Sequence, residues 1–132
     1  MADSLLKRLE TNASVHGKKD ALTFLSTSGA IETKLTYDDI VNETNTLAAN
    51  LAASGLKKGD LAVLVFPPSL DFIIAFIACL KAGIVAVPVF PPHPARKDTL
   101  IMFTKIVEES GAKFALTSAS YSHMKKLACK SV

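Results

Sequence analysis

The sequence is poor in the residues that build most metal, disulfide and catalytic sites. Its 132 residues include only two cysteines, Cys79 and Cys129, which lie far apart and have no Cys-x-x-Cys pairing or histidine cluster beside them. This spacing argues against a zinc site and a disulfide framework, so both are expected to be buried thiols in a reducing compartment. The three histidines are isolated, and no serine stands in a nucleophile-elbow pattern. Neither a catalytic residue nor a metal ligand is therefore predicted.

Glycine motifs that bind phosphate are also absent. The six glycines match neither Gly-x-Gly-x-x-Gly nor the spacing of a phosphate loop. Each of them has an explanation as a turn or a helix cap. The sequence therefore predicts no cofactor bound by these residues.

Charge is scarce and evenly spread. Charged residues make up 20% of the chain, and 15 basic against 12 acidic residues give a net charge of +3. The lysines do not form a basic tract with interleaved aromatic residues, so no nucleic-acid partner is predicted. The sequence begins Met-Ala-Asp-Ser and lacks the positively charged segment, followed by an apolar segment, that marks a signal peptide. A cytoplasmic location is expected.

Apolar residues, in contrast, are abundant. They make up 49% of the chain and give a mean hydropathy of +0.32, which is too apolar for a disordered tail. The excess lies between Leu61 and Pro92, where only Asp71 and Lys81 are charged. A membrane helix needs about 20 uninterrupted apolar residues, and here prolines, a glycine and the two charges divide the stretch. We therefore expect buried strands and a helix, and no membrane span.

The order of the elements predicts an α/β fold with a doubly wound, mostly parallel sheet and flanking helices. A short helix capped by Ser4 and a β-hairpin with strands at 21–25 and 31–35 precede that sheet. The next helix begins after Thr36, where Asp39 completes a capping box. Its apolar residues, Tyr37 among them, recur every three or four positions, so one stripe is expected to face a core.

The remaining elements alternate between strand and helix. We expect buried strands at 61–66 and 84–89, and a third strand at 113–117. A helix capped by Ser69 is expected at 70–82, and a second helix is expected to begin after Asp98 as its cap. A third helix is expected to contain Tyr121, Met124, Leu127 and Ala128.

The carboxyl ends of parallel strands define the face where a ligand is expected. That face takes in residues 66–69, 90–96 and 117–120. Phe90 and the neighbouring prolines are suited to wall an apolar channel, and Arg96 is suited to meet an anionic group. The competing interpretation is that the prolines stiffen a crossover and Arg96 is solvated. The candidate substrate-binding residues are Phe66, Ser69, Phe90, Pro91 and Arg96.

Two ordered motifs resemble those of the adenylate-forming enzymes. Residues 35–40, Leu-Thr-Tyr-Asp-Asp-Ile, are similar to the first core motif, Leu-Thr/Ser-Tyr-x-Glu-Leu. Residues 80–89, Leu-Lys-Ala-Gly-Ile-Val-Ala-Val-Pro-Val, resemble the second, with Ala86 where many members carry tyrosine. Residues 87–96, Val-Pro-Val-Phe-Pro-Pro-His-Pro-Ala-Arg, look most like the corresponding stretch of fatty acyl-AMP ligases, with Phe90 in place of the commoner tyrosine. The resemblance covers nearly the whole chain.

The resemblance implies an enzyme that uses ATP and magnesium to convert a fatty acid into an acyl adenylate, which then passes to the thiol of an acyl carrier protein. Such enzymes serve fatty acid metabolism and polyketide or lipopeptide biosynthesis. Residues 1–132 lack the family's phosphate loop, its later nucleotide motifs and the small C-terminal domain with the catalytic lysine. They are therefore expected to be an N-terminal scaffold portion, inactive alone, whose partners are the remainder of the enzyme, the fatty acid and the carrier protein.

Three alternatives remain open. The chain is also compatible with a standalone, non-catalytic interaction module of the same fold, or with a fragment of an acyl-CoA synthetase. A flavodoxin-like domain is the weakest alternative, because the acidic cluster and the glycine-rich loop of such domains are missing. In isolation the chain is expected to self-associate through an unpaired sheet edge and an apolar patch.

Overall fold

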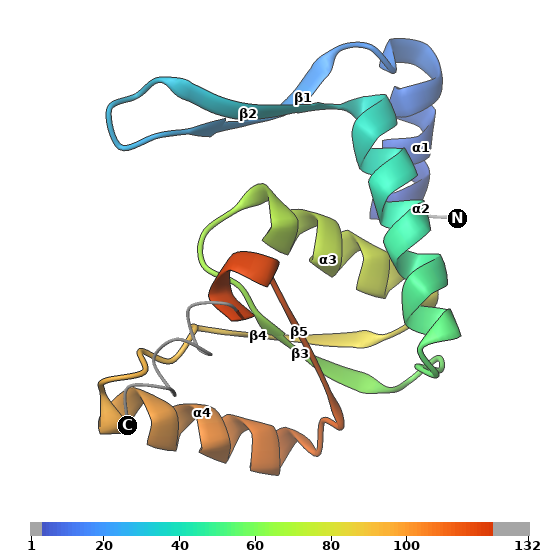
Figure 1. Cartoon of the computed structure of the whole chain (residues 1–132). Helices are drawn as coiled ribbons and strands as arrows, with labels where there is room; N and C mark the ends of the chain where they lie inside the picture. The colour runs from blue at the N-terminus through green and yellow to red at the C-terminus, as the bar shows by residue number, and fades with distance from the viewer. Residues whose placement is uncertain (1–3, 123–132) are drawn as a thin grey trace.

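The computed structural model describes residues 4–122, which fold into a helix, a hairpin and then alternating strands and helices (Figure 1). The helices are α1 (Leu5–His16), α2 (Tyr37–Ala53), α3 (Leu70–Ala82) and α4 (Lys97–Ser110), and the strands are β1 (Asp20–Leu25), β2 (Ile31–Thr36), β3 (Leu61–Val65), β4 (Val85–Val89) and β5 (Phe114–Thr117). Residues 119–122 begin a further helix. The expected positions Met124, Leu127 and Ala128 of that helix, and Cys129, lie outside the described residues.

The three parallel strands form one sheet in the order β4-β3-β5. Helices α2 and α3 lie on one side of this sheet and α4 lies on the other (Figure 1). Ala62 and Leu64 of β3 therefore pack in the cluster with α2 and α3, whereas Val63 and Val65 pack in the cluster with α4. Because both faces of β3 are covered, its apolar residues run without interruption. The predicted α/β fold with a parallel sheet and flanking helices is confirmed.

Helix α2 begins with the expected capping box. The Asp39 N–H donates to Thr36 Oγ1 at 3.2 Å, and Asp39 Oδ2 accepts from the Thr36 N–H at 2.9 Å. The hydrogen bond from the Thr36 backbone, followed by the one from its side chain, lowers the pKa of Asp39. Tyr37, expected on the core-facing stripe, is only half-buried and lies outside the clusters of packed apolar residues. That expectation was wrong, because the first residue of the helix lies beside the hairpin and not over the core.

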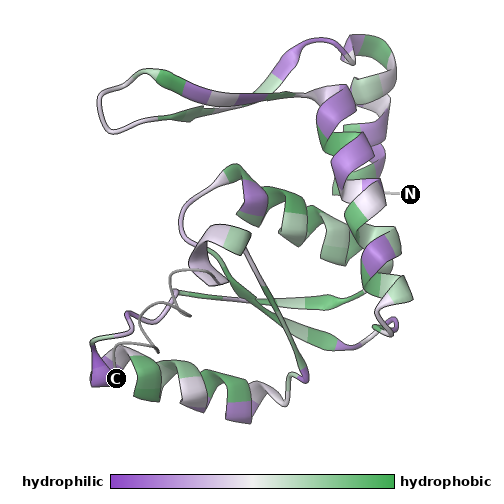
Figure 2. Cartoon of the chain, viewed as in Figure 1, coloured by the Kyte–Doolittle hydropathy of each residue, from purple (hydrophilic) through white to green (hydrophobic). Residues whose placement is uncertain are grey.

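Helix α3 is apolar around most of its circumference because two different layers cover it. Ala78 and Cys79 pack in the cluster that contains β3, on the side of the sheet. Ile74 packs instead with Leu35 of β2 and Ile40 of α2. Hydrophobic residues accordingly dominate α3 and the sheet in Figure 2, whereas polar residues are frequent on α2. The N-terminal elements therefore form the outer cover of α3.

The start of α4 and the burial of β4 differ from expectation. Arg96, and not Asp98, occupies the cap position of α4, and its side chain makes no capping hydrogen bond. Asp98 lies in the first turn and pairs with Arg96, with 2.8 Å between Nη2 and Oδ2. The strand expected at 84–89 is an edge strand within the described residues, so Val85 is 48% exposed instead of buried. The other strand ends differ from expectation by one residue, which is the usual fraying of element boundaries.

Cys79 is fully buried and free, as expected, and burial raises the pKa of its thiol. The most apolar described helix, α3, has 13 residues and is too short to cross a bilayer. Within residues 4–122, no helix combines the length and the hydropathy of a membrane span.

Candidate functional site

The segment after β3 is built around an aromatic pair and a helix cap. The rings of Phe66 and Phe72 meet edge to face, with 6.4 Å between their centroids. Ser69 Oγ accepts from the Phe72 N–H at 3.4 Å and donates to the Pro67 carbonyl at 2.9 Å. Both bonds are local to the turn, so Ser69 serves to begin α3.

The segment after β4 is the Pro-rich loop, which we define as residues 90–96. Phe90 is 94% exposed, whereas Pro92 is buried. Three prolines remove backbone donors from this loop, so it cannot continue as strand or helix. Its carboxyl end is held locally, where the His93 N–H donates to Thr99 Oγ1 at 3.1 Å and that hydroxyl donates to the Arg96 carbonyl at 2.8 Å.

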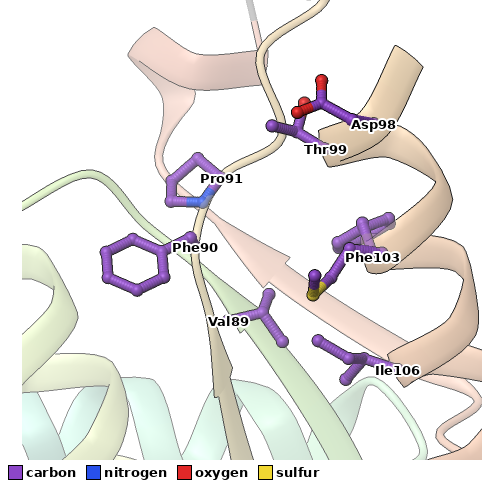
Figure 3. A pocket seen from close by; sticks show the side chains of 8 residues that line it. Val89, Phe90, Pro91, Asp98, Thr99, Phe103 and Ile106 are labelled. Carbon is purple, nitrogen blue, oxygen red and sulfur yellow. The ribbon is translucent and has the colours of Figure 1, made fainter. Parts of the chain in front are cut away.

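Two apolar hollows flank this loop at the carboxyl ends of the strands. The first, of about 360 Å³, lies between the loop and α4, where the side chains of Val89, Phe103 and Ile106 converge (Figure 3). The ring of Phe90 points away from α4 in that view. The second hollow, which we call the strand-end hollow, measures about 370 Å³ and lies toward α3. It is lined by Phe66, Pro67, Pro68, Phe72, Pro88, Val89, Phe90, Pro91 and Ile106.

The strand-end hollow brings together three of the five candidate residues, Phe66, Phe90 and Pro91. Ser69 and Arg96 are not among its lining residues. The Arg96 guanidinium makes two hydrogen bonds with the Asp98 carboxylate, at 2.8 and 3.3 Å, and both side chains are mostly exposed. The Arg96 guanidinium is therefore paired with Asp98, two residues away, and is not directed into the strand-end hollow.

Sequence reasoning missed Phe72 and Ile106, which reach the strand-end hollow from α3 and α4. A signal for Phe72 exists, because it stands three residues after the cap Ser69 and thus in the first turn above the end of β3. Ile106 carries no comparable signal, since its place depends on how α4 packs across the sheet.

The chemistry that these hollows offer is apolar contact. Asp98 is the one ionisable side chain that lines either of them, and it is paired with Arg96. Within residues 4–122, no three side chains of His, Cys, Asp or Glu lie close enough to share a metal ion. The lining of the two hollows offers no cationic side chain for a triphosphate, and we assign no step of nucleotide chemistry to these residues.

Comparison with known proteins decides the family. Residues 9–131 match the family model of AMP-binding enzymes. The chain belongs to that family. Among solved structures, the chain is similar to a fatty acid AMP ligase from Legionella pneumophila, with a TM-score of 0.83 and 35% identity over 96% of the chain. The resemblance to the N-terminal part of adenylate-forming enzymes is thereby confirmed.

Relatives in sequence include ligases and one protein named for an interaction. The chain is 30% identical over 125 residues to JamA of Moorena producens, a medium-chain-fatty-acid–[acyl-carrier-protein] ligase, covering 93% of the chain. It is 34% identical over 86 residues, or 64% of the chain, to Disco-interacting protein 2 of Drosophila melanogaster. The chain spans 21% of JamA, 5% of Disco-interacting protein 2 and 21% of the Legionella chain.

The N-terminal subdomain of NpsA from Klebsiella oxytoca shares the fold, with a TM-score of 0.73 at 22% identity over 89% of the chain and 28% of its own length.

Proposed function

We propose that these residues form the N-terminal part of a fatty acyl-AMP ligase and provide one wall of its acyl-binding site. The observation that carries the proposal is the strand-end hollow, an apolar space of about 370 Å³ at the carboxyl ends of parallel strands. Its walls suit a hydrocarbon chain, because each buried methylene group contributes about 0.8 kcal/mol. The similarity to the Legionella fatty acid AMP ligase supports the same assignment.

For the whole enzyme, we propose ATP-dependent formation of an acyl adenylate and transfer of the acyl group to a carrier-protein thiol, in a cytoplasmic setting. JamA supports a carrier protein as acceptor, since its name specifies that acceptor and a medium-chain fatty acid. ATP and magnesium would bind to parts of the enzyme other than residues 4–122, whose role is to bind and orient the acyl chain. A place in polyketide or lipopeptide biosynthesis remains part of this proposal.

The test of the acyl-binding role measures binding of a long-chain fatty acid that carries an environment-sensitive fluorophore. Phe90→Ser should weaken binding about tenfold, because full burial of a phenylalanine contributes ~1.5–3 kcal/mol and 1.4 kcal/mol is a factor of ten. Phe90 is 94% exposed, so the melting temperature should not change.

Ile31→Ser is the matched control, since Ile31 is 59% exposed but lies in the hairpin, away from the hollow. It should leave binding unchanged. Equal affinity of the Phe90→Ser and unmodified chains, or the lack of saturable binding, would contradict the acyl-binding role.

We propose further that the 132 residues have no ligase activity alone. A pyrophosphate-release assay with ATP and a fatty acid should show no turnover. Measurable turnover by the 132-residue chain would refute this part of the proposal.

We also propose that the isolated chain self-associates. Large apolar side chains are exposed around β4 and along α4, which is unusual for a monomeric surface. These side chains are Val85, Phe90, Ile101 and Met102, with exposed fractions of 48%, 94%, 66% and 64%.

A further inference from the structure

Tyr121 connects the helix that begins at residue 119 with the Pro-rich loop, which is distant from it in the sequence. It lies in the helix that begins at residue 119, is 7% exposed, and packs with Val63 and Val65 on the α4 side of the sheet. Its Oη donates to the Pro92 carbonyl at 2.7 Å. Burial raises the pKa of Tyr121, so its hydroxyl keeps the proton it donates through a wide range of pH.

This bond holds the middle of the Pro-rich loop. Among the described residues, Tyr121 is the one side chain outside the segment 89–100 that hydrogen-bonds to the loop. The bonds made by Thr99 and His93 are local and fix the carboxyl end of the loop to the start of α4.

The position of Phe90 depends on the backbone of this loop. At 94% exposure, the ring has almost no packing of its own to hold it. Pro91 and Pro92 have fixed φ angles, so the backbone between Phe90 and the anchored Pro92 carbonyl has little freedom. Fixing that carbonyl therefore fixes where Phe90 and Pro91 stand in the wall of the strand-end hollow.

We propose that Tyr121 is a positioning residue for the strand-end hollow, whose hydroxyl holds the Pro-rich loop through the Pro92 carbonyl and so sets the placement of Phe90 and Pro91. The proposal rests on the proposed function in one respect, namely that the hollow receives an acyl chain. Tyr121 itself does not line the hollow.

The test compares Tyr121→Phe with Tyr37→Phe in the 132-residue chain. Tyr121→Phe removes the hydroxyl and keeps the buried ring. Tyr37→Phe is the matched control, because the chain has two tyrosines and no hydrogen bond of the Tyr37 hydroxyl is found within residues 4–122. Trypsin must bind several extended residues on both sides of the bond that it cuts, so cleavage after Arg96 requires release of the loop back to the Pro92 anchor as well as of its carboxyl end, and cleavage after Lys57 in the turn before β3 is the internal control.

Tyr121→Phe should speed cleavage after Arg96 about fivefold, because the usual net contribution of one hydrogen bond to stability corresponds to roughly that factor in the population of the open loop. Cleavage after Lys57 should not change, and Tyr37→Phe should change neither site. Unchanged cleavage after Arg96 would overturn the proposal. An equal acceleration at both sites would also overturn it, because it would mean that the whole fold and not the loop had loosened.

A second measurement separates positioning from a structural role. Tyr121→Phe should weaken binding of the fluorescent fatty acid several-fold at a temperature where both chains are fully folded, whereas a purely structural residue would change only the melting temperature. If the unmodified chain binds the fatty acid and Tyr121→Phe binds it equally well, the positioning role fails alone. If the unmodified chain binds none, the proposed function fails, and the role of Tyr121 in ligand binding fails with it.

Discussion

Arg96 shows how a near neighbour decides the role of a charged side chain. By its place after a parallel strand, it is a candidate for binding an anion. In the structure its guanidinium forms a two-bond pair with Asp98, and the exposed fractions of the two side chains are 65% and 67%. Such an exposed pair contributes little to stability, so its main effect is to direct Arg96 along the start of α4. The competing interpretation of a solvated Arg96 is the one the geometry favours.

The capping box of α2 yields a prediction about pH. The pKa of Asp39 is lowered from 3.8 in the folded chain, so its contribution to stability is complete above that value and disappears as the pH falls through the lowered pKa. The melting temperature of the unmodified chain should therefore fall in this acidic range, and Asp39→Asn should reduce that fall. Thermal unfolding followed by circular dichroism between neutral pH and about pH 2 measures this. Parallel curves for the two chains would contradict it.

The partner residue of the box makes a separate prediction. Thr36→Ala removes the oxygen that accepts from the Asp39 N–H, and loss of such a cap costs about 1 kcal/mol. Chemical denaturation at neutral pH should show this loss. Thr46→Ala is a suitable control, because Thr46 is exposed in the same helix and its hydroxyl donates only to the Asn42 carbonyl of the preceding turn. A Thr36→Ala chain as stable as the control would contradict the prediction.

The burial of Leu64 and Tyr37 predicts how much free energy of unfolding is lost when each is replaced by alanine. Leu64 in the central strand has no exposed surface, and Leu64→Ala should cost about 2–5 kcal/mol because it leaves a cavity between packed layers. Tyr37 is half-buried, so Tyr37→Ala should cost clearly less. Urea denaturation of both variants tests this order, and a larger loss for Tyr37→Ala would refute it.

At the scale of the elements, most helix caps could be predicted from the sequence, with the cap of α4 as the exception, whereas tertiary placement could not. Caps at Ser4, Thr36 and Ser69 follow from hydrogen bonds within three residues, and all three are found where expected. The burial of β4 depends on how many strands lie beside it, which no local pattern contains. The strand-end hollow likewise unites Phe66 and Phe90 with Ile106, which only the packing of α4 brings near. For the same reason, three candidate residues were found together and two were not.

The two edges of the parallel sheet differ chemically. The Val85 N–H donates to the Asp60 carbonyl at 2.8 Å, so the backbone N–H groups of alternate β4 residues point toward β3. The backbone groups of Ala86 and Pro88 then point away from β3, and Pro88 has no N–H to donate to a further strand. Strand β5 contains no proline, and a hollow of about 470 Å³ lies beside it toward α3. Within the described residues, the β5 edge therefore offers more free backbone donors than the β4 edge, and we expect edge-to-edge pairing at β5.

At the scale of the whole molecule, this difference predicts the route of self-association. Ala115→Lys places a charge on the exposed face of β5 and should shift the isolated chain toward monomer, since charged edge strands resist pairing. Val85→Lys places the same charge on β4, where Pro88 already removes one donor, and should have less effect. Size-exclusion chromatography with light scattering at several concentrations measures both.

Two outcomes would contradict this prediction. A larger shift for Val85→Lys than for Ala115→Lys would refute the assignment to β5. A monomer of constant mass at every concentration for the unmodified chain would refute self-association itself.

The cover that the N-terminal elements provide for α3 also bears on the order in which the protein is made. Synthesis proceeds from the N-terminus, so β2 with Leu35 and α2 with Ile40 leave the ribosome before Ile74 of α3 does. When α3, the most apolar of the described helices, emerges, the residues that pack on its outer side have already been made and only β3 of the sheet on its inner side is present. The outer cover of α3 is therefore synthesised before α3 itself, whereas β4 and β5 of the sheet on its inner side follow it.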